Sequence, residues 1–181
     1  MTIQAAVILA GGKSVRMGQD KSELIWQGQI LWEYQEATVK LAGFDNILVA
    51  RNKKGFLQDN PDFLYMGPLA GFEAALKRLQ TVDCQYLLCL PVDMPLVTVD
   101  MLKRLMIAAA EDNQNHEVIT YRDQVFPLIL NVSAYDKLVS YLKERRSVKG
   151  FIESLSHLSI MSHKEDDFRN TNTLQEWQEI Q

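Results

Sequence analysis

The sequence predicts an α/β protein, a three-layer α/β/α sandwich built around a mostly parallel sheet. Two observations lead to this fold class. Apolar runs that suit buried strands alternate along the chain with segments whose apolar residues recur at helical spacing. No repeat, low-complexity tract or Pro/Gly/Ser-rich linker divides the 181 residues, which favours a single domain over residues 1–181. Ligands of such folds bind at the carboxyl ends of the strands.

The expected elements alternate regularly in the first half of the chain and less so in the second. We expect strands over residues 3–10, 46–50, 86–90, 117–121 and 125–130. We expect helices over residues 31–41, 69–79, 99–109, 134–143, 148–155 and 173–180. Glycine or proline stands at several borders, Thr98 has the side chain of a helix N-cap, and the polar residues 122–124 form a turn between the last two strands.

Charge, hydropathy and cysteine content exclude several classes of function. The formal net charge of −4 argues against a nucleic-acid partner, because binding to a phosphate backbone usually leaves a basic surplus. No apolar run approaches the roughly 18 residues that span a bilayer, so no membrane partner is expected. Cys84 and Cys89 are the only cysteines. If they share a strand, their odd separation points them to opposite faces, so we expect no disulfide and a reduced, cytoplasmic setting.

The segment after the first predicted strand combines glycines with cations. Three glycines within residues 11–18 allow backbone N–H groups to converge on an anion, and Lys13, Arg16 and Lys21 add positive charge. A Walker A loop is excluded because it requires glycine at the position of Val7. The alternating glycines of a dinucleotide fingerprint are also absent. An exposed glycine turn would not explain cations gathered behind a buried strand, so the segment predicts a phosphate-binding loop.

A rigid aspartate follows the predicted strand 86–90. Asp93 stands between Pro91 and Pro95, which restrict the backbone conformations of this segment. A fixed carboxylate suits Mg2+, which typically takes one or two carboxylates together with substrate phosphates. The alternative is that Asp93 caps a turn or the helix that begins near Thr98. Opposite a phosphate loop, we favour the metal-binding role.

These motifs resemble a known family. The string LAGGKSVRMGQDKSEL, residues 9–24, is similar to the N-terminal signature of nucleotidyltransferases with a Rossmann-like, glycosyltransferase-A-like fold. Within that superfamily the chain resembles the molybdenum cofactor guanylyltransferase (MobA) family, which also shares G-P-L-A-G, here 67–71, and F-x-N-x-N-T, here 168–173. The resemblance implies an enzyme that transfers GMP from GTP to the terminal phosphate of molybdopterin, with Mg2+ as cofactor, and releases pyrophosphate. It also suggests transient contact with other proteins of molybdenum cofactor biosynthesis or with acceptor proteins.

The resemblance implies roles for individual residues. Catalysis falls to Arg16, Lys21 and Asp93, with Asp93 as the metal ligand. The nucleotide is held by Leu9, Ala10, Gly11, Gly12, Lys13, Ser14, Lys21, Asn52 and Asp93. The acceptor is held by Arg145, Arg146, Asn170 and Asn172. Read without the resemblance, the two arginines belong to a solvated face and Asn172 or Thr173 caps the last helix.

Two departures from the family pattern fall on the nucleotide side. Members commonly carry an asparagine after the second strand, where Asn52 is the candidate here, and an aspartate several residues before G-P-L-A-G. The stretch 62–67 offers no acid at the expected place for that aspartate. Alternatives therefore stay open: a nucleotidyltransferase of the same superfamily that uses CTP or another acceptor, or a non-catalytic nucleotide-binding member.

Overall fold

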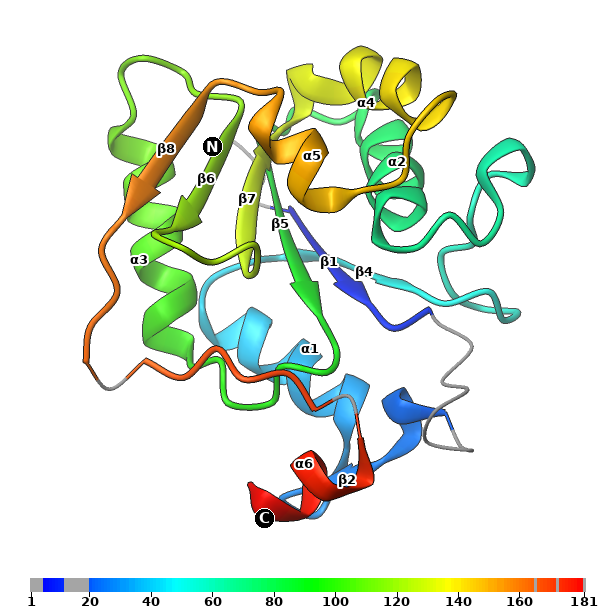
Figure 1. Cartoon of the computed structure of the whole chain (residues 1–181), viewed down its shortest axis with the longest axis vertical. Coiled ribbons are helices and arrows are strands. Elements are labelled where there is room, and N and C mark those ends of the chain that lie inside the picture. Colours follow the sequence, from blue (N-terminus) through cyan, green and yellow to red (C-terminus); the bar gives the residue numbers. More distant parts are fainter. Residues whose placement is uncertain (1–4, 12–19, 165, 172, 181) are drawn as a thin grey trace.

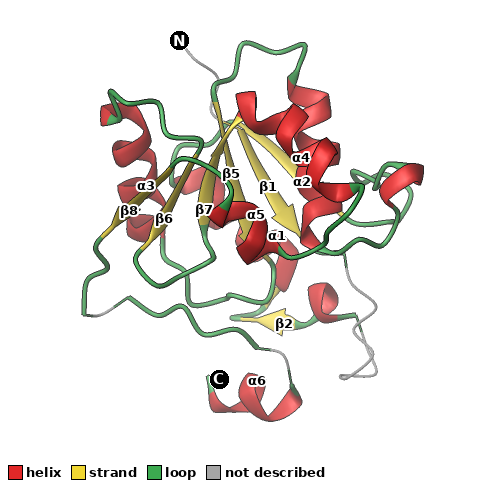
Figure 2. Ribbon diagram, turned by 45° about the horizontal axis from the view of Figure 1, so that its top comes forward, coloured by secondary structure: helices red, strands yellow, loops and turns green. Residues whose placement is uncertain are grey.

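A six-stranded sheet crosses the centre of the molecule and carries helices on both faces (Figures 1 and 2). This computed structural model describes residues 5–11, 20–164, 166–171 and 173–180. The strand order is β4-β1-β5-β7-β6-β8, and β7 alone runs antiparallel to its neighbours. The strands of this sheet are β1 Ala5–Leu9, β4 Asn46–Ala50, β5 Tyr86–Pro91, β6 Val118–Tyr121, β7 Leu128–Asn131 and β8 His157–Ile160.

Helices cover the two faces of the sheet and make a three-layer sandwich, as predicted. The α-helices are α1 Leu31–Leu41, α2 Pro68–Leu79, α3 Val99–Glu111, α4 Tyr135–Leu142, α5 Val148–Glu153 and α6 Leu174–Glu179. Successive residues of a strand point to opposite faces. Ala5, Val7 and Leu9 therefore join one core, with residues of α2, α4 and α5, while Ala6 and Ile8 join the other, with residues of α1 and α3.

The chain connections bring three strand ends together. The chain passes from β1 through α1 to β4, and then through α2 to β5, which lies on the other side of β1. Because these three strands are parallel, their carboxyl ends meet at one edge of the sheet. α2 packs closely here, since a Cβ on Gly71 would lie 2.7 Å from Cδ2 of Leu9. A larger residue in place of the second glycine of G-P-L-A-G would therefore force the Leu9 side chain to shift.

Most predicted elements are confirmed, with differences at the borders. Each predicted helix matches an observed one to within two residues at either end. The strand predicted at 125–130 begins only at Leu128, because Pro127 has no N–H for a sheet ladder. The antiparallel hairpin β2 Ile25–Trp26 and β3 Gln29–Ile30 and the edge strand β8 were not predicted. Short 3-10 turns lie at η1 Lys21–Glu23, η2 Pro61–Phe63 and η3 Val132–Ala134.

Cys84 and Cys89 form no disulfide, as expected, but not because they share a strand. Cys84 precedes β5 and does not share a strand with Cys89, and both thiols pack against the same core. Both are free. Among the residues that the structure describes, no helix is long and apolar enough to cross a membrane.

Candidate active site

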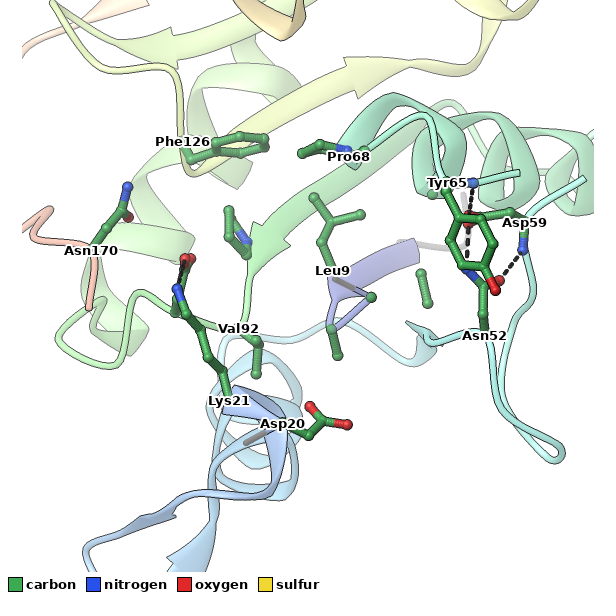
Figure 3. Close-up of a pocket in the computed structure, with 17 residues that line it drawn as sticks. Leu9, Asp20, Lys21, Asn52, Asp59, Tyr65, Pro68, Val92, Phe126 and Asn170 are labelled. Carbon is green, nitrogen blue, oxygen red and sulfur yellow. Dashed lines mark hydrogen bonds and ion pairs between the residues drawn. The ribbon is translucent and has the colours of Figure 1, made fainter. Parts of the chain in front are cut away.

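A cleft of about 650 Å³ lies at the carboxyl ends of β1, β4 and β5 (Figure 3). Leu9 is the last residue of β1 and Gly11 lies just after it. Asn52 follows β4, and Asp93 follows β5. In Figure 3 Leu9 lies in the middle of the cleft, with Lys21 and Asn170 toward one end and residues such as Tyr65 toward the other. We call these the Asp93 end and the rim-loop end, where the rim loop is residues 51–66.

An ion pair occupies the Asp93 end. Nζ of Lys21 lies 3.5 Å from Oδ2 of Asp93, and their side chains are only 16% and 22% exposed. Burial raises the pKa of the Asp93 carboxyl, while the neighbouring Lys21 ammonium opposes that shift. Lys21 begins η1, whose N-cap is Asp20. The pair presents one carboxylate and one cation to the same corner of the cleft, an arrangement suited to phosphate groups and a divalent ion.

Buried groups from distant elements fix the backbone around Asp93. The backbone N–H of Thr171 donates to the Asp93 carbonyl at 2.9 Å, and its hydroxyl donates to the same oxygen at 3.3 Å. On the opposite face of the sheet from α2, Nε2 of Gln35 in α1 donates to the Met94 carbonyl at 2.8 Å. Gln35 is fully buried and Thr171 is 2% exposed. Two consecutive carbonyls are thereby held, and Asp93 is oriented by α1 and by the chain that precedes α6.

The rim-loop end presents an acid held by an amide. Nδ2 of Asn52 donates to Oδ2 of Asp59 at 2.8 Å, and the backbone N–H of Asp59 donates to Oδ1 of Asn52 at 2.9 Å. The backbone N–H of Tyr65 also donates to Oδ2 of Asp59, at 3.1 Å. All three residues line the cleft. Both donors use Oδ2, so the carboxylate is oriented without engaging Oδ1.

An ion-pair network around the buried Arg51 joins η1 to the rim loop. Nη2 of Arg51 lies 2.9 Å from Oδ2 of Asp20 and 2.5 Å from Oε1 of Glu23, and the arginine side chain is only 3% exposed. Nζ of Lys53 lies 2.8 Å from the same Asp20 oxygen. Burial alone would raise the pKa of Asp20, but hydrogen bonds from Lys53, Ser22 and Arg51 outweigh it and lower the pKa to about 2. Asp20 is therefore ionised and saturated with donors.

The structure brings together part of the predicted site. Seven of its residues line the cleft: Leu9, Ala10, Gly11, Lys21, Asn52, Asp93 and Asn170. Five lie outside the described residues: Gly12, Lys13, Ser14, Arg16 and Asn172. Arg145 and Arg146 are exposed between α4 and α5 and do not line the cleft, so their contact with the acceptor stays a prediction.

Several residues of the cleft were not identified from the sequence. The family's aspartate was expected in the stretch 62–67, but the acid at the rim-loop end of the cleft is Asp59, three residues before that stretch. Tyr65 and Phe126 also line the cleft and carry no sequence signal, since lone aromatic residues are common in cores. Gln35 and Thr171 do not line the cleft; they hold the backbone carbonyls of Asp93 and Met94, and no sequence pattern marks such a role.

The donor groups at the Asp93 end fit a magnesium-like ion whose remaining ligands come from substrate phosphates. Among the described residues no three His, Cys, Asp or Glu side chains gather in a way that would hold a metal. A single partly buried carboxylate suits such a site when substrate phosphates supply further oxygen ligands. Asp20 is not a second candidate, because its oxygens already accept from Ser22, Arg51 and Lys53.

The fold and the cleft define a class of protein. A mostly parallel sheet whose strand ends carry Gly11, a lysine and a partly buried aspartate is a nucleotide-binding α/β arrangement. The chain belongs to the MobA-like NTP transferase domain family, whose family model matches residues 6–159. It is therefore a nucleotidyltransferase by family.

Individual relatives agree with this membership over nearly their whole length. The chain is 30% identical to a molybdenum cofactor guanylyltransferase of Xanthomonas euvesicatoria, covering 99% of this chain and 97% of the relative. It is 31% identical to one of Pseudomonas syringae, covering 96% and 94%. Its fold is similar to that of molybdopterin-guanine dinucleotide biosynthesis protein A from Archaeoglobus fulgidus, with a TM-score of 0.77, 20% identity and coverage of 97% and 95%. A Mycobacterium tuberculosis protein solved in complex with manganese has the same fold, with a TM-score of 0.68 and 15% identity over 98% and 97% of the two chains.

Proposed function

We propose that this protein transfers GMP from GTP to the terminal phosphate of molybdopterin and releases pyrophosphate. The observation that carries the proposal is the pair of differently built ends of one cleft. Lys21 and Asp93 supply charge at one end, and the Asp59 carboxylate is oriented at the other. That arrangement suits a nucleoside triphosphate with its base at the rim loop. The names of the full-length relatives support guanine and molybdopterin as the specific substrates.

The rim-loop end favours guanine over the other bases. Guanine presents N1–H and the exocyclic N2 amino group side by side, and a carboxylate is the acceptor that can take both. Asn52 and the Tyr65 N–H hold Asp59 in a fixed orientation for that purpose. Cytosine offers one exocyclic amino donor, so it satisfies only part of this acceptor.

The Asp93 end favours transfer without a general base. A phosphate monoester has a second pKa near 6, so the acceptor is largely anionic at neutral pH. Its oxygen attacks the α-phosphorus of GTP in line, a P–O bond to the acceptor forms, and the bond to pyrophosphate breaks. The Lys21 ammonium neutralises charge on the phosphates, and Asp93 would hold Mg2+, which supplies further charge neutralisation when bound. Arg16 and Lys13 are further cations of the same loop in the sequence.

The proposal is tested with a panel of substrates. The protein is incubated with Mg2+, molybdopterin and each of the four nucleoside triphosphates, and pyrophosphate release and product mass are measured. We expect release with GTP and a guanine dinucleotide product. Turnover with CTP, or with GTP only when another phosphorylated acceptor replaces molybdopterin, indicates the alternative transferases. Nucleotide binding without any release indicates the non-catalytic alternative.

The setting of this reaction is part of the proposal. We place it in the cytoplasm, which the free thiols of Cys84 and Cys89 support. Transient contact with other proteins of molybdenum cofactor biosynthesis, or with the proteins that receive the product, would follow from handing on a bound cofactor. Fractionation and cross-linking in cells test both points.

A further inference from the structure

A buried carboxylate lies behind the rim loop, outside the cleft. Glu73 of α2 is fully buried, and its Oε1 accepts from Nδ2 of Asn60 at 3.2 Å and from the hydroxyl of Tyr135 at 3.3 Å. Its Oε2 is also buried and has no hydrogen-bond partner among the described residues. The residues around it on α2, from Leu69 to Leu76, are buried apolar ones.

Stability alone does not account for an acid at this position. Burying a carboxylate with one unsatisfied oxygen is unfavourable, and apolar residues of similar volume often replace buried polar groups with no loss of stability. A leucine or methionine at residue 73 would continue the apolar face of α2 and pack against α4. Glu73 therefore has a role other than core packing, and the two side chains that donate to it, Asn60 and Tyr135, indicate that role.

The two donors come from elements that are far apart in the sequence. Tyr135 begins α4, while Asn60 lies in the rim loop directly after Asp59. Asn60 also caps η2, since its Oδ1 accepts from the backbone N–H of Asp62 at 3.2 Å. Glu73 thus ties the middle of the rim loop to the helix that forms the wall of the cleft.

This tie is next in the chain to Asp59 and helps to fix its position. Asn52 and the Tyr65 N–H set the direction of the Asp59 side chain, but both donors belong to the same loop and move with it. The ion-pair network of Arg51 anchors the start of the loop, backbone hydrogen bonds pair Leu57 with the end of β4, and Phe63, 8% exposed, anchors the far end in the core. Among the described residues between Leu57 and Phe63, the side chain of Asn60 links the segment beside Asp59 to α2 through its bond to Glu73.

We infer that Glu73 is a positioning residue for base specificity. Through its bond to Asn60 it fixes where the Asp59 carboxylate lies in the cleft, and this position determines the preference for guanine. This inference rests on the proposed function, in which Asp59 contacts the base. Glu73 itself does not line the cleft and touches no substrate in this scheme. Its loss should change recognition of the base and leave the Asp93 end intact.

The test compares nucleotide binding in Glu73→Met and Glu73→Gln. Dissociation constants for GTP, ATP and CTP are measured by calorimetry, together with kcat and KM for pyrophosphate release. Glu73→Met removes the acceptor, and loss of one such bond predicts GTP binding weaker by about tenfold. ATP and CTP binding and kcat at saturating GTP should stay within about twofold, because no hydrogen bond at the Asp93 end changes. Glu73→Gln keeps an acceptor oxygen and should retain the preference for GTP.

A second pair of variants keeps the test decisive if Glu73→Met fails to fold. Asn60→Ser keeps a hydroxyl that can cap η2 but removes the amide that reaches Glu73, so it should reproduce the loss of GTP affinity. Thr120→Val removes a similarly buried hydroxyl from β6, whose partner is His157, and should leave all nucleotide affinities unchanged.

The outcomes separate the inference from the proposed function. Equal weakening of GTP and ATP in the Met variant, or a Gln variant as defective as the Met variant, overturns the positioning role. An unchanged preference for GTP in both Glu73→Met and Asn60→Ser also overturns it. A wild-type protein that shows no preference for GTP contradicts the proposed function first, and the role of Glu73 in guanine recognition falls with it.

Discussion

At the Asp93 end of the cleft, the functional groups follow the ends of buried central strands, whereas at the rim-loop end Asn52, Asp59 and Tyr65 all belong to one largely exposed loop. The backbone at Asp93 is held from two sides, by Thr171 and by Gln35 of α1. The rim loop pairs with β4 through the backbone of Leu57, and beyond that residue it is held by side-chain bonds such as that of Asn60 to Glu73.

This difference has a physical consequence for how each end can change. Moving Asp93 requires moving β5, whose residues 87–90 are fully buried, and the cost would be that of disrupting the core. Moving Asp59 requires breaking a few side-chain hydrogen bonds, each of which contributes about 1 kcal/mol. We infer that the chemistry is fixed by the sheet, while base recognition is adjustable by a small number of loop substitutions.

The largest effect is expected from Asp93→Asn. The variant keeps the shape of the side chain but removes the charge that would hold the metal, and loss of one transition-state contact of this kind costs about 10²–10³ in rate. Pyrophosphate release should fall by that factor at saturating GTP. GTP affinity measured without metal should not fall, because a negative charge beside the triphosphate has been removed.

Asp100→Asn provides the matched control for this prediction. Asp100 is an exposed acid in the first turn of α3, and its side chain pairs with Arg104 rather than with the cleft. Turnover of Asp93→Asn within about tenfold of the wild type would contradict the metal assignment, given the magnitude expected for such a contact.

The rim-loop end is tested by Asp59→Asn. An asparagine keeps an oxygen for the donors Asn52 and Tyr65, but it presents an amino group where guanine also presents donors. A mismatched pair of this kind costs about 1–3 kcal/mol, so GTP should bind about 10-fold to 100-fold more weakly. Calorimetry with GTP and ATP measures the effect, and ATP should be affected less than GTP.

The control for this substitution is Asp62→Asn. Asp62 lies three residues further along the same loop, is exposed, and does not line the cleft. It should leave the affinities for both nucleotides unchanged. Equal losses in the two variants would indicate a general effect of charge on nucleotide binding and would remove the case for base recognition by Asp59.

A smaller effect is expected from Gln35→Met, which tests how rigidly the Asp93 end is held. Methionine has a similar shape but cannot donate to the Met94 carbonyl, and loss of one hydrogen bond of this kind corresponds to about fivefold. The concentration of Mg2+ that gives half-maximal rate should rise by that factor, with the KM for GTP unchanged. Direct titration with Mn2+, followed by electron paramagnetic resonance, gives a reading that does not depend on turnover.

Thr38→Val distinguishes this effect from a loss of stability. Thr38 is also buried on α1, but its hydroxyl donates to the Tyr34 carbonyl within the same helix. Both variants should lower the free energy of unfolding, and only Gln35→Met should change metal binding. Weaker metal binding in both variants would mean that α1 affects the cleft through the stability of the fold alone.

The contrast between the two ends also explains how much could be predicted. Gly11 and Asp93 directly follow buried central strands, where the apolar runs are clearest, and the fold class was predicted from those runs. Asp59 was missed because a loop has no period that ties its residues to the sheet. Its place in the cleft depends on contacts such as Asn60 with Glu73, which join residues 13 positions apart.

The edge strand β8 and the hairpin of β2 and β3 were not predicted for similar reasons. β8 is an edge strand of four residues that alternate between exposed and partly buried, so it lacks the apolar run of the central strands. The hairpin of β2 and β3 has two residues in each strand and turns at Gln27 and Gly28, both with positive φ. Its Trp26 ring packs against Trp177 of α6, at 5.4 Å between centroids, a contact between the two ends of the chain that no local pattern contains.

The smallest effect is expected from Asp20→Asn, which weakens the link between the two ends. Because hydrogen bonds lower the pKa of Asp20 from 3.8 to about 2 in the folded protein, its charge stabilises the fold above pH 3.8, and this stabilisation is lost as the pH falls toward 2. The variant should therefore be less stable than the wild type at pH 7, by about 1 kcal/mol for a partly exposed group. Urea unfolding at pH 7, 5, 4 and 3 should show this difference constant down to about pH 4 and shrinking below it. A difference that stays constant down to pH 3 would mean that Asp20 contributes its shape rather than its charge, and the ion pair with Arg51 would then not be what joins η1 to the rim loop.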